Sequence, residues 1–308
     1  MTGFALSLLR RLIFILALVW GVTLAAFGLF RVGVSSPATN AQISQQLGPG
    51  QPVWQYSHYL LRLLHGNLGD SLIVGVSVDG LLRSALPPTL SLMIGGMVLW
   101  LVTGVLAGTV SALRRGSWAD RIVTGGVLAG LMVPTFLLAL LLLGVFVLLA
   151  NWGSLWLQPG YMPFTQSPGQ WLGRMILPWI AVAATQAGLT ARLTRAAVLD
   201  ALGEDYIQTA RAKGLTQRRT FWVHVLRPAI TPVVASVSAG FGTMLGSVAI
   251  VDQVFALGGI GQSLLTAVKS GDLMVIMGTA LVAVVLISLV NLVTDICQAL
   301  LDPRVKLT

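Results

Sequence analysis

A short polar stretch between two apolar runs carries the side chains best suited to recognition chemistry. It reads Asp205-Tyr206-Ile207-Gln208-Thr209-Ala210-Arg211-Ala212-Lys213-Gly214-Leu215, and His224-Val225-Leu226-Arg227-Pro228 follows soon after. Its charged and amide groups suit contact with another protein, whereas nearly everything around it is apolar. We therefore expect a protein partner to bind this stretch; the alternative is an ordinary solvated loop.

Two short helical pieces must position these side chains. In the first piece, acidic Glu204 and Asp205 precede basic Arg211 and Lys213, an order that suits the helix macrodipole. Gly214 stands where a helix C-cap is expected, because glycine takes positive φ without steric cost. Helical spacing predicts an apolar face made of Leu199, Leu202, Tyr206 and Ala210.

The second helical piece follows Gly214, and Thr216 is its candidate N-cap. Its predicted apolar face consists of Phe221, Trp222 and Val225. Pro228 then marks the start of the next apolar run. The expected result is a bent helical lever joined to two apolar runs, so that a push on the lever would move both runs.

Composition places these elements in a membrane. Of the 308 residues, 56% are hydrophobic and only 9% are charged, and mean hydropathy is +0.86, whereas soluble domains carry about 25% charged residues. Apolar runs long enough to cross a bilayer lie at 11–30, 86–112, 122–150, 175–197, 230–251 and 274–298. We expect an all-α integral membrane protein with about six transmembrane helices.

The expected organisation has three parts. Residues 1–30 form an N-terminal tail and first transmembrane helix, 31–85 an outer segment with short helices, and 86–308 a transmembrane core that includes the polar loop 199–228. Within the outer segment, Gln55–Leu64 is predicted to form an amphipathic helix. The first apolar run is long for a signal peptide and no clear cleavage site follows it, so a retained helix is favoured.

The basic residues predict the orientation. If the N-terminus is cytoplasmic, 14 of the 19 lysines and arginines are inside and 5 are outside, which favours both termini and the polar loop in the cytoplasm. The inner set is Arg10, Arg11, Arg114, Arg115, Arg121, Arg192, Arg195, Arg211, Lys213, Arg218, Arg219, Arg227, Arg304 and Lys306. The same bias explains the net charge of +9 without nucleic acid. An interfacial belt is expected of Trp152, Trp156, Trp171 and Trp179.

Catalytic and metal-binding patterns are missing from the sequence. None of its lysines follows a glycine, so a phosphate-binding G-x-x-x-x-G-K-[ST] loop is impossible. His58, His65 and His224 lack metal-ligand spacing, and the single cysteine, Cys297, cannot form a disulfide framework. We expect no catalytic residues, no metal site and no cofactor on this chain.

Two polar positions inside the apolar runs leave alternatives open. Gln186 could line a path through the membrane or bond a neighbouring helix. Asp295, one turn after Asn291, is interpreted as an interhelical or interfacial anchor, with a gate or proton site as the alternative.

The polar stretch resembles a known family signature. Gln208-Thr209-Ala210-x-x-x-Gly214 is similar to the EAA-x-x-x-G string of ABC importer permeases, and Asp205–Leu215 resembles the dipeptide/oligopeptide/nickel subfamily. Further similar strings, in the same order along the chain, are Gln51-Pro52…Gln55-Tyr56, Leu68-Gly69-x-Ser71, Leu86-Pro87-x-Thr89-Leu90, Arg114–Arg121, Arg192–Arg195, Gly258-x-x-Gly261 and Leu301–Arg304. The departures are Val34–Pro37, Asn67, Asp70, Gln208 and Pro228.

The resemblance implies a type I ABC importer permease in a bacterial or archaeal plasma membrane. It implies transport of di- or oligopeptides, with nickel, heme-like molecules and sugars as alternative cargoes. The implied partners are a second homologous permease, two ATPase subunits or a fused ATPase that bind ATP and Mg²⁺, and an extracytoplasmic solute-binding protein. Asp205–Leu215 would then seat on the ATPase.

Two other classes of protein fit the sequence less well. A self-sufficient secondary transporter needs ion sites near the bilayer midplane, where these runs carry almost no charge. A membrane enzyme would need a reactive cluster that is missing, and a structural role leaves the family signature without explanation.

Overall fold

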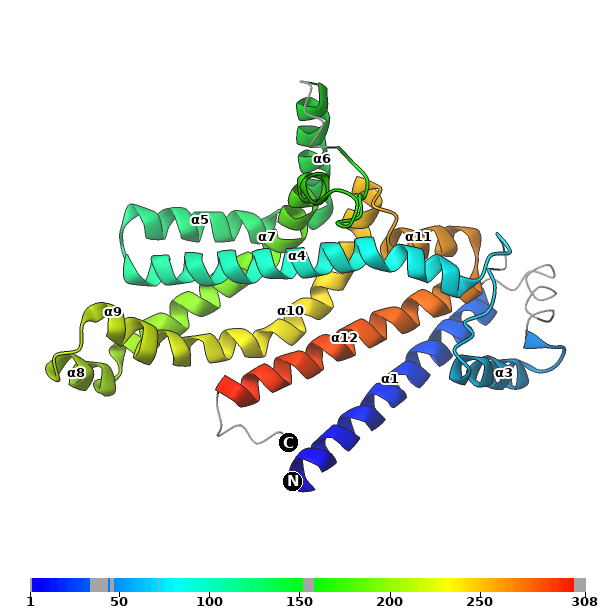
Figure 1. The fold of residues 1–308 in the computed structure, drawn as a ribbon, viewed down its shortest axis with the longest axis horizontal. Coiled ribbons are helices and arrows are strands. Elements are labelled where there is room, and N and C mark those ends of the chain that lie inside the picture. The colour runs from blue at the N-terminus through cyan, green and yellow to red at the C-terminus, as the bar shows by residue number, and fades with distance from the viewer. Residues whose placement is uncertain (1, 34–43, 45–46, 72, 152–157, 302–308) are drawn as a thin grey trace. The chain divides into compact units, whose positions relative to one another are not determined.

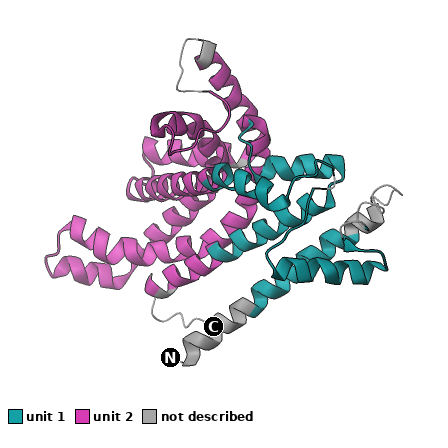
Figure 2. Ribbon diagram, turned by 45° about the vertical axis from the view of Figure 1, so that its right-hand side comes forward, with its two compact units in different colours: residues 1–90, 256–289 teal, residues 91–255, 290–308 magenta. Residues whose placement is uncertain are grey.

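The structure is a computed structural model that describes residues 2–33, 44, 47–71, 73–151 and 158–301. Within these residues the regular secondary structure is helical, as predicted (Figure 1). Four described helices are long and apolar enough to cross a membrane, at Val78–Leu113, Pro168–Gly203, Gln217–Phe255 and Leu273–Gln298, and shorter apolar segments lie at Ile13–Gly28 and Thr135–Leu149. The chain divides into two compact units (Figure 2).

The first unit comprises residues 1–90 and 256–289. It contains α1 (Thr2–Gly33), α3 (Pro52–Leu64), the start of α4 (Val78–Leu113), α11 (Ile260–Ser270) and the start of α12 (Leu273–Leu301). Its core joins all five helices through buried side chains that include Phe27, Tyr59, Leu82, Ala267 and Met274.

The predicted helix in the outer segment is confirmed as α3, and it begins three residues earlier, at Pro52. Tyr56 fixes it to α1, because its hydroxyl lies 2.9 Å from Thr23 Oγ1 and donates to the Trp20 carbonyl at 3.1 Å. Tyr59 is also buried, but its hydroxyl has no hydrogen-bond partner among the described residues. Burial raises the pKa of Tyr59 to about 12, so its phenol stays protonated near neutral pH.

The second unit comprises residues 91–255 and 290–308. It contains the rest of α4, then α5 (Trp118–Met132), α6 (Thr135–Asn151), α7 (Pro168–Gly203), α8 (Asp205–Ala212), α9 (Gln217–Thr220), the π-helix η1 (Phe221–Val225) and α10 (Leu226–Phe255). Helix α7 is central, because α5, α6 and α10 all pack against it.

Small residues let α4 approach α7 closely. A Cβ atom added at Gly104 would lie 2.7 Å from Thr190 Cβ, and one at Gly108 would lie 2.4 Å from the Ala191 carbonyl oxygen. Trp100 Nε1 donates to Thr190 Oγ1 at 2.5 Å in the same interface. Gln186 Nε2 donates to the Gly240 carbonyl at 3.2 Å, which supports an interhelical bond rather than a free pathway side chain.

Two helix boundaries differ from the prediction. The run 122–150 is not one helix, because α5 ends before Val133, whose ψ is 119°, and α6 begins after Pro134 (Figure 1). Proline disfavours the α conformation in the residue before it, which explains the break. Helix α4 begins at Val78 rather than at residue 86, so the last residues assigned to the outer segment are its first two turns.

The predicted tryptophan belt is wrong for Trp179. Its side chain is buried, Nε1 donates to the Ser91 carbonyl at 2.8 Å, and its ring packs edge-on against Trp171 at 5.1 Å. Trp179 therefore packs within the protein, whereas Trp171 is half-buried. The other two predicted members, Trp152 and Trp156, lie outside the described residues, as do Val34–Pro37 and the terminal basic residues Arg304 and Lys306.

Candidate functional site

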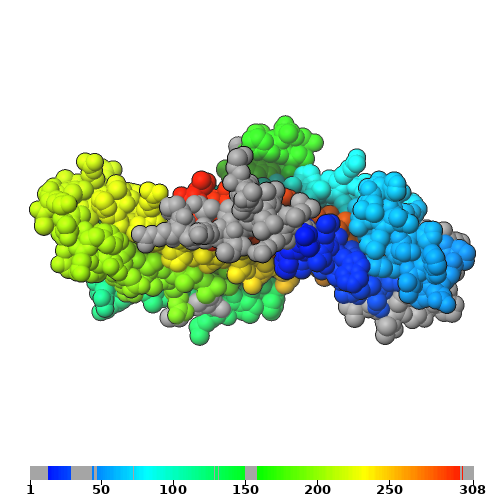
Figure 3. Space-filling view, turned by 90° about the horizontal axis from the view of Figure 1, so that it is seen from below, coloured from blue at the N-terminus to red at the C-terminus, as the bar shows by residue number. Residues whose placement is uncertain are grey.

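The polar stretch forms a separate short helix at the end of α7. Helix α7 ends at Gly203, Glu204 takes an extended conformation with ψ of 142°, and α8 runs from Asp205 to Ala212. The segment that holds α8, α9 and η1 is uncovered in the space-filling view, where it is yellow-green (Figure 3). A short helix, set off from the long helices by a backbone break, is thus presented on the surface.

Helix α8 is anchored by two side chains, Ile207 and Ala210, which are 0% and 8% exposed. Ile207 joins a buried cluster that we call the inner cluster. Its members are Ala112 of α4, Val198 and Ala201 of α7, Ile207 of α8, Val225 of η1 and Ala229 of α10. Because one side chain of α8 belongs to a cluster shared by the ends of three long helices, α8 is mechanically tied to all of them.

The rest of α8 faces solvent. Among the predicted site residues, those that are exposed are Asp205, Tyr206, Gln208, Thr209, Arg211, Ala212, Lys213 and Gly214, while Leu215 is half-buried. The predicted apolar face was therefore wrong at Tyr206, which is 45% exposed and donates from its hydroxyl to the His224 carbonyl at 3.3 Å. The predicted face assumes one continuous helix through Glu204, but the helix breaks there, and Ile207 points inward instead of Tyr206.

The predicted caps are confirmed. Gly214 has φ of +80° and donates its N–H to the Arg211 carbonyl at 2.9 Å, which closes α8. Thr216 Oγ1 accepts from the Arg219 amide at 3.4 Å and opens α9. These two caps set the bend between the helical pieces.

A groove of about 340 Å³ lies beside this bend. Its lining includes Arg211 of α8, Arg218 of α9 and the aromatic pair Phe221 and Trp222 of η1, whose rings meet edge-on at 5.7 Å. Within the predicted apolar face of the second piece, Val225 is buried and Phe221 half-buried, but Trp222 is 58% exposed. The exposed site is therefore basic and aromatic rather than only basic.

An ion pair that the sequence reasoning missed holds the helix ends beside the inner cluster. Arg195 of α7 donates from Nε to Asp120 Oδ1 at 3.0 Å and from Nη2 to Oδ2 at 3.1 Å. Ser111 of α4 also donates to Asp120, and the Gly116 amide reaches Oδ2 at 2.9 Å. The hydrogen bond from Arg195 has the largest effect, and together with those from Ser111 and Gly116 it holds the pKa of Asp120 well below its usual range. The carboxylate therefore stays charged.

This ion pair connects two strings that the sequence had marked separately, Arg114–Arg121 and Arg192–Arg195. It joins the start of α5 to α4 and α7, only a few turns before α7 leads into α8. Residue type alone could not have shown the pairing, because the partners lie 75 positions apart. We call Ser111, Asp120 and Arg195 the clasp.

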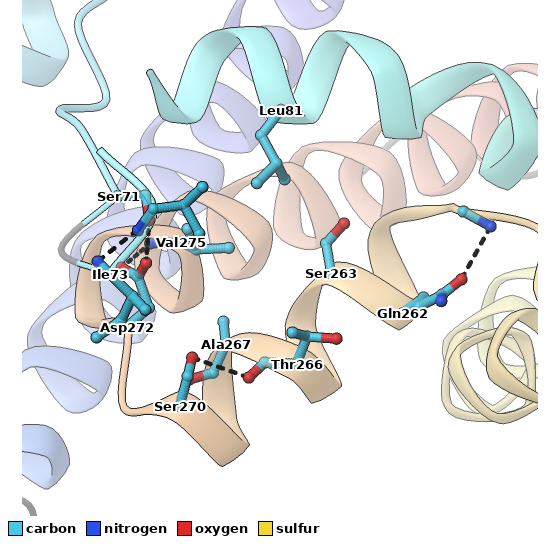
Figure 4. Close-up of a pocket in the computed structure, with 12 residues that line it drawn as sticks. Ser71, Ile73, Leu81, Gln262, Ser263, Thr266, Ala267, Ser270, Asp272 and Val275 are labelled. Carbon is cyan, nitrogen blue, oxygen red and sulfur yellow. Dashed lines mark hydrogen bonds between the residues drawn. The ribbon is translucent and has the colours of Figure 1, made fainter. Parts of the chain in front are cut away.

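A separate hollow lies in the first unit. It has a volume of about 260 Å³ and is lined by hydroxyl and small side chains of α11 together with aliphatic side chains such as Ile73, Leu81 and Val275 (Figure 4). Ser71 donates to Asp272 Oδ2 at 2.5 Å, and the Gly258 amide donates to Gln262 Oε1 at 3.0 Å (Figure 4). No cluster of three potential metal-binding side chains occurs anywhere in the described part of the chain. This hollow is mainly apolar, with hydroxyl groups along one side.

Long apolar helices with a surface helix tied to their ends are the architecture of an integral membrane protein. The sequence model of the binding-protein-dependent transport system inner membrane component family matches residues 104–307, and the chain belongs to this family. It is thus a permease component of an ABC importer, a multi-pass protein of the inner membrane that works with an ATPase and a substrate-binding protein.

Relatives match along most of the chain. A putative peptide transport system permease protein of Brucella abortus is 35% identical over 88% of this chain and 86% of its own length. A di/tripeptide transport system permease protein of Pseudomonas aeruginosa is 33% identical, covering 96% of this chain and 97% of its own. A probable peptide ABC transporter permease protein of Sinorhizobium fredii is 32% identical, covering 97% and 98%.

A solved structure shares the fold. A chain of the MetNI methionine ABC transporter, in an inward-facing conformation, aligns with a TM-score of 0.57 at 21% identity. The alignment covers 73% of this chain and 97% of the other. At this identity the similarity concerns the fold, which is that of a type I importer permease.

Proposed function

We propose that this permease carries di- or oligopeptides across the inner membrane, delivered by an extracytoplasmic solute-binding protein. The support is the similarity to three relatives that are named as peptide permeases, at 32 to 35% identity over most of the chain. We further propose that Asp205–Leu215 is the surface on which the ATPase acts, and that both chain termini are cytoplasmic because 14 of 19 basic residues then lie inside.

One observation supports the proposed coupling role most directly. Helix α8 has its anchor, Ile207, in the inner cluster, and it leaves polar side chains such as Gln208, Thr209 and Arg211 exposed. A surface that only avoided lipid would not need to be tied to three long helices. A surface that transmits force needs both an exposed contact face and a rigid attachment.

The proposed mechanism is a population shift between inward-open and outward-open states. Two ATPase subunits, or one fused ATPase, would bind ATP and Mg²⁺ and close around them, and this chain would contribute no residue to that chemistry. Closure would displace α8, and the inner cluster would pass the displacement to α4, α7 and α10. ATP can shift the equilibrium only through contacts that differ between the two states, and the proposal is that these contacts are made at α8 and the adjacent groove.

A second homologous permease completes the proposed assembly. One chain offers one α8 surface, whereas a pair of ATPase sites calls for two such surfaces. Two permease chains, each with a coupling helix, would satisfy that geometry. The transport path would then lie between them, and side chains on both would line it.

The first test is the composition of the assembly. The tagged chain is purified from its native membrane in mild detergent, and the co-purifying proteins are identified by mass spectrometry. We expect a P-loop ATPase, a second permease and a solute-binding protein. Recovery of the folded chain alone would contradict the importer assembly and favour a self-sufficient transporter.

The second test is cargo. The recovered complex is reconstituted in liposomes with its binding protein, and ATP-dependent uptake of a labelled dipeptide, an oligopeptide and free methionine is compared. We expect uptake of a peptide and none of methionine. Uptake of methionine or of nickel in preference to peptides would overturn the cargo proposal while leaving the coupling proposal intact.

A further inference from the structure

A groove next to the clasp has the features of an anion site. It has a volume of about 460 Å³ and lies between α5 and α7, with Ser111 of α4 at one side. This volume falls within the range of ligand-binding pockets, about 300 to 1,000 Å³. Its polar lining residues are Ser111, Thr124, Arg192 and Arg195, and its apolar walls include Val123 and Val127.

The groove carries an excess positive charge. Arg192 and Arg195 stand three positions apart on α7, so they share one side of the helix. Arg195 donates hydrogen bonds from Nε and Nη2 to Asp120, and this ion pair carries no net charge. Arg192 is exposed and makes no hydrogen bond or ion pair with any residue in the described ranges. One uncompensated guanidinium therefore lines the groove.

The groove has apolar walls, formed by Val123, Val127, Ala191 and Ala196, and exposed apolar residues precede or follow its lining residues in the sequence. Ile122 of α5 and Leu193 of α7, sequence neighbours of lining residues, are 70% and 42% exposed. These side chains suit lipid acyl chains, whereas a free phosphate or nucleotide would gain nothing from them. Basic pockets between membrane helices on the cytoplasmic side are suited to anionic lipid head groups.

We propose that this groove binds the head group of an anionic phospholipid of the cytoplasmic leaflet. Arg192 would donate hydrogen bonds to the phosphate, the Thr124 hydroxyl would assist it, and the acyl chains would follow the apolar surface beside Ile122. Guanidinium groups suit phosphate because their planar fork offers parallel donors. The site goes beyond the proposed peptide transport, and its test does not require a transported substrate.

Such a lipid would bridge α5 and α7 beside the clasp. It would contact α5 and α7 where Asp120 and Arg195 already join them, a few turns before α7 leads into α8. Its presence would favour the arrangement in which these helix ends stay together. The function of the site would therefore be to make the efficiency of coupling depend on anionic lipid.

Native mass spectrometry of the purified importer complex tests the binding. Delipidated complex is titrated with phosphatidylglycerol or with phosphatidylcholine of the same acyl chains. We expect one tightly bound phosphatidylglycerol and no matching phosphatidylcholine. In Arg192→Gln, binding should weaken by about fivefold, the loss of one basic contact near the membrane surface.

Arg115→Gln is the matched control. It removes the same charge from the exposed turn between α4 and α5, outside the groove. We expect it to leave phosphatidylglycerol binding within about twofold, since a bound head group contacts only the groove. Equal loss in both variants would show that diffuse charge explains the effect, and equal binding of the two lipids would show that head-group charge is not recognised. Either result would overturn the site.

Two further measurements separate other occupants and do not depend on the folding of a variant. A photoactivatable phosphatidylglycerol should cross-link to peptides of α5 and α7 around the groove in the wild-type complex. Cross-links found only elsewhere, or found only after the second permease is removed, would overturn the proposal. Displacement of the lipid by millimolar inorganic phosphate would likewise assign the groove to a free anion.

Discussion

Helices α3 and α8 are both short and amphipathic, but α3 exposes its apolar face and α8 exposes its polar face. Helix α3 turns Gln55 and two tyrosines inward and leaves Val53, Trp54, Leu61 and Leu64 exposed. Helix α8 turns Ile207 and Ala210 inward and leaves charged and amide side chains exposed. The same helical periodicity therefore serves an outward apolar face in one unit and an outward polar face in the other.

The difference shows why hydropathy alone is a poor guide to a short helix beside a membrane. An exposed apolar face suits lipid or an apolar partner, whereas the polar face of α8 suits water and a soluble protein. The anchoring also differs, because α3 combines apolar packing with hydrogen bonds of the Tyr56 hydroxyl, whereas α8 is held by apolar packing beside an ionic clasp. Each of the following predictions tests one side of this comparison.

The largest effect is expected from Gly214→Pro. Gly214 has φ of +80°, which proline cannot adopt, and its N–H donates to Arg211. The substitution should abolish ATP-dependent uptake while the chain remains in the membrane fraction. Gly214→Asn is the control, because asparagine tolerates positive φ and should keep most of the uptake. Normal uptake by Gly214→Pro would break the argument that the bend of α8 transmits force.

A smaller but still large effect is expected from Ala210→Asp. Ala210 is buried, so an unpaired carboxylate there should destabilise the anchored state of α8 by about 3 kcal/mol or more. Ala212→Asp introduces the same charge two residues away at an exposed position. Cleavage by trypsin after Arg211 and Lys213 should accelerate only in Ala210→Asp. Equal acceleration in both variants would mean that α8 is not anchored as the comparison requires.

Local chemistry in the sequence was enough to predict the bend of this region. Gly214 as a cap and Thr216 as an N-cap follow from backbone sterics and hydrogen bonding within a few residues, and both are confirmed. The inward side of α8 was mispredicted, since a single unfavourable position, Glu204, reset the helical phase. Apolar composition predicted the long helices. It did not predict the break before Pro134, because the residues on both sides of this proline are strongly apolar.

Tertiary pairing could not be read from the sequence. Asp120 lies in a basic string and Arg195 in another, and nothing in either string indicates that they meet. The burial of Trp179 has the same explanation, since an aromatic side chain near a helix end suits either a membrane interface or a packed interior. Only the close approach of α4 and α7 decides that it packs inside.

The third prediction concerns the clasp, where a charged group holds the helix ends, in contrast to the uncharged hydroxyl groups of α3. Asp120→Asn should lower the midpoint of thermal unfolding by several degrees, because Arg195 loses its charged partner. Asp200→Asn, at an exposed position of α7 near Arg195 in the sequence, should not lower it. Because the folded pKa of Asp120 lies below its unfolded value near 3.9, its stabilisation is complete above that value and is lost only as pH falls through the folded pKa.

The pH dependence follows from that sign. Between about pH 5 and pH 8 the carboxylate is charged in both folded and unfolded chains, so the difference in midpoint between wild type and Asp120→Asn should stay constant. Thermal unfolding in detergent at three pH values in this window measures it. A difference that vanished by pH 5 would mean that the carboxylate is not held in its charged form.

The smallest effects are expected within α3, where two tyrosines one turn apart form a matched pair. Tyr56→Phe removes a hydroxyl that bonds Thr23 and the Trp20 carbonyl, and should cost about 1 kcal/mol of unfolding free energy. Tyr59→Phe removes a buried hydroxyl without a partner among the described residues, and should be neutral or stabilise by up to about 1 kcal/mol. Denaturant titration in detergent compares them. Equal destabilisation by both changes would mean that Tyr59 has a polar partner in the assembled importer. Both tyrosine hydroxyls, and not only that of Tyr56, would then anchor α3.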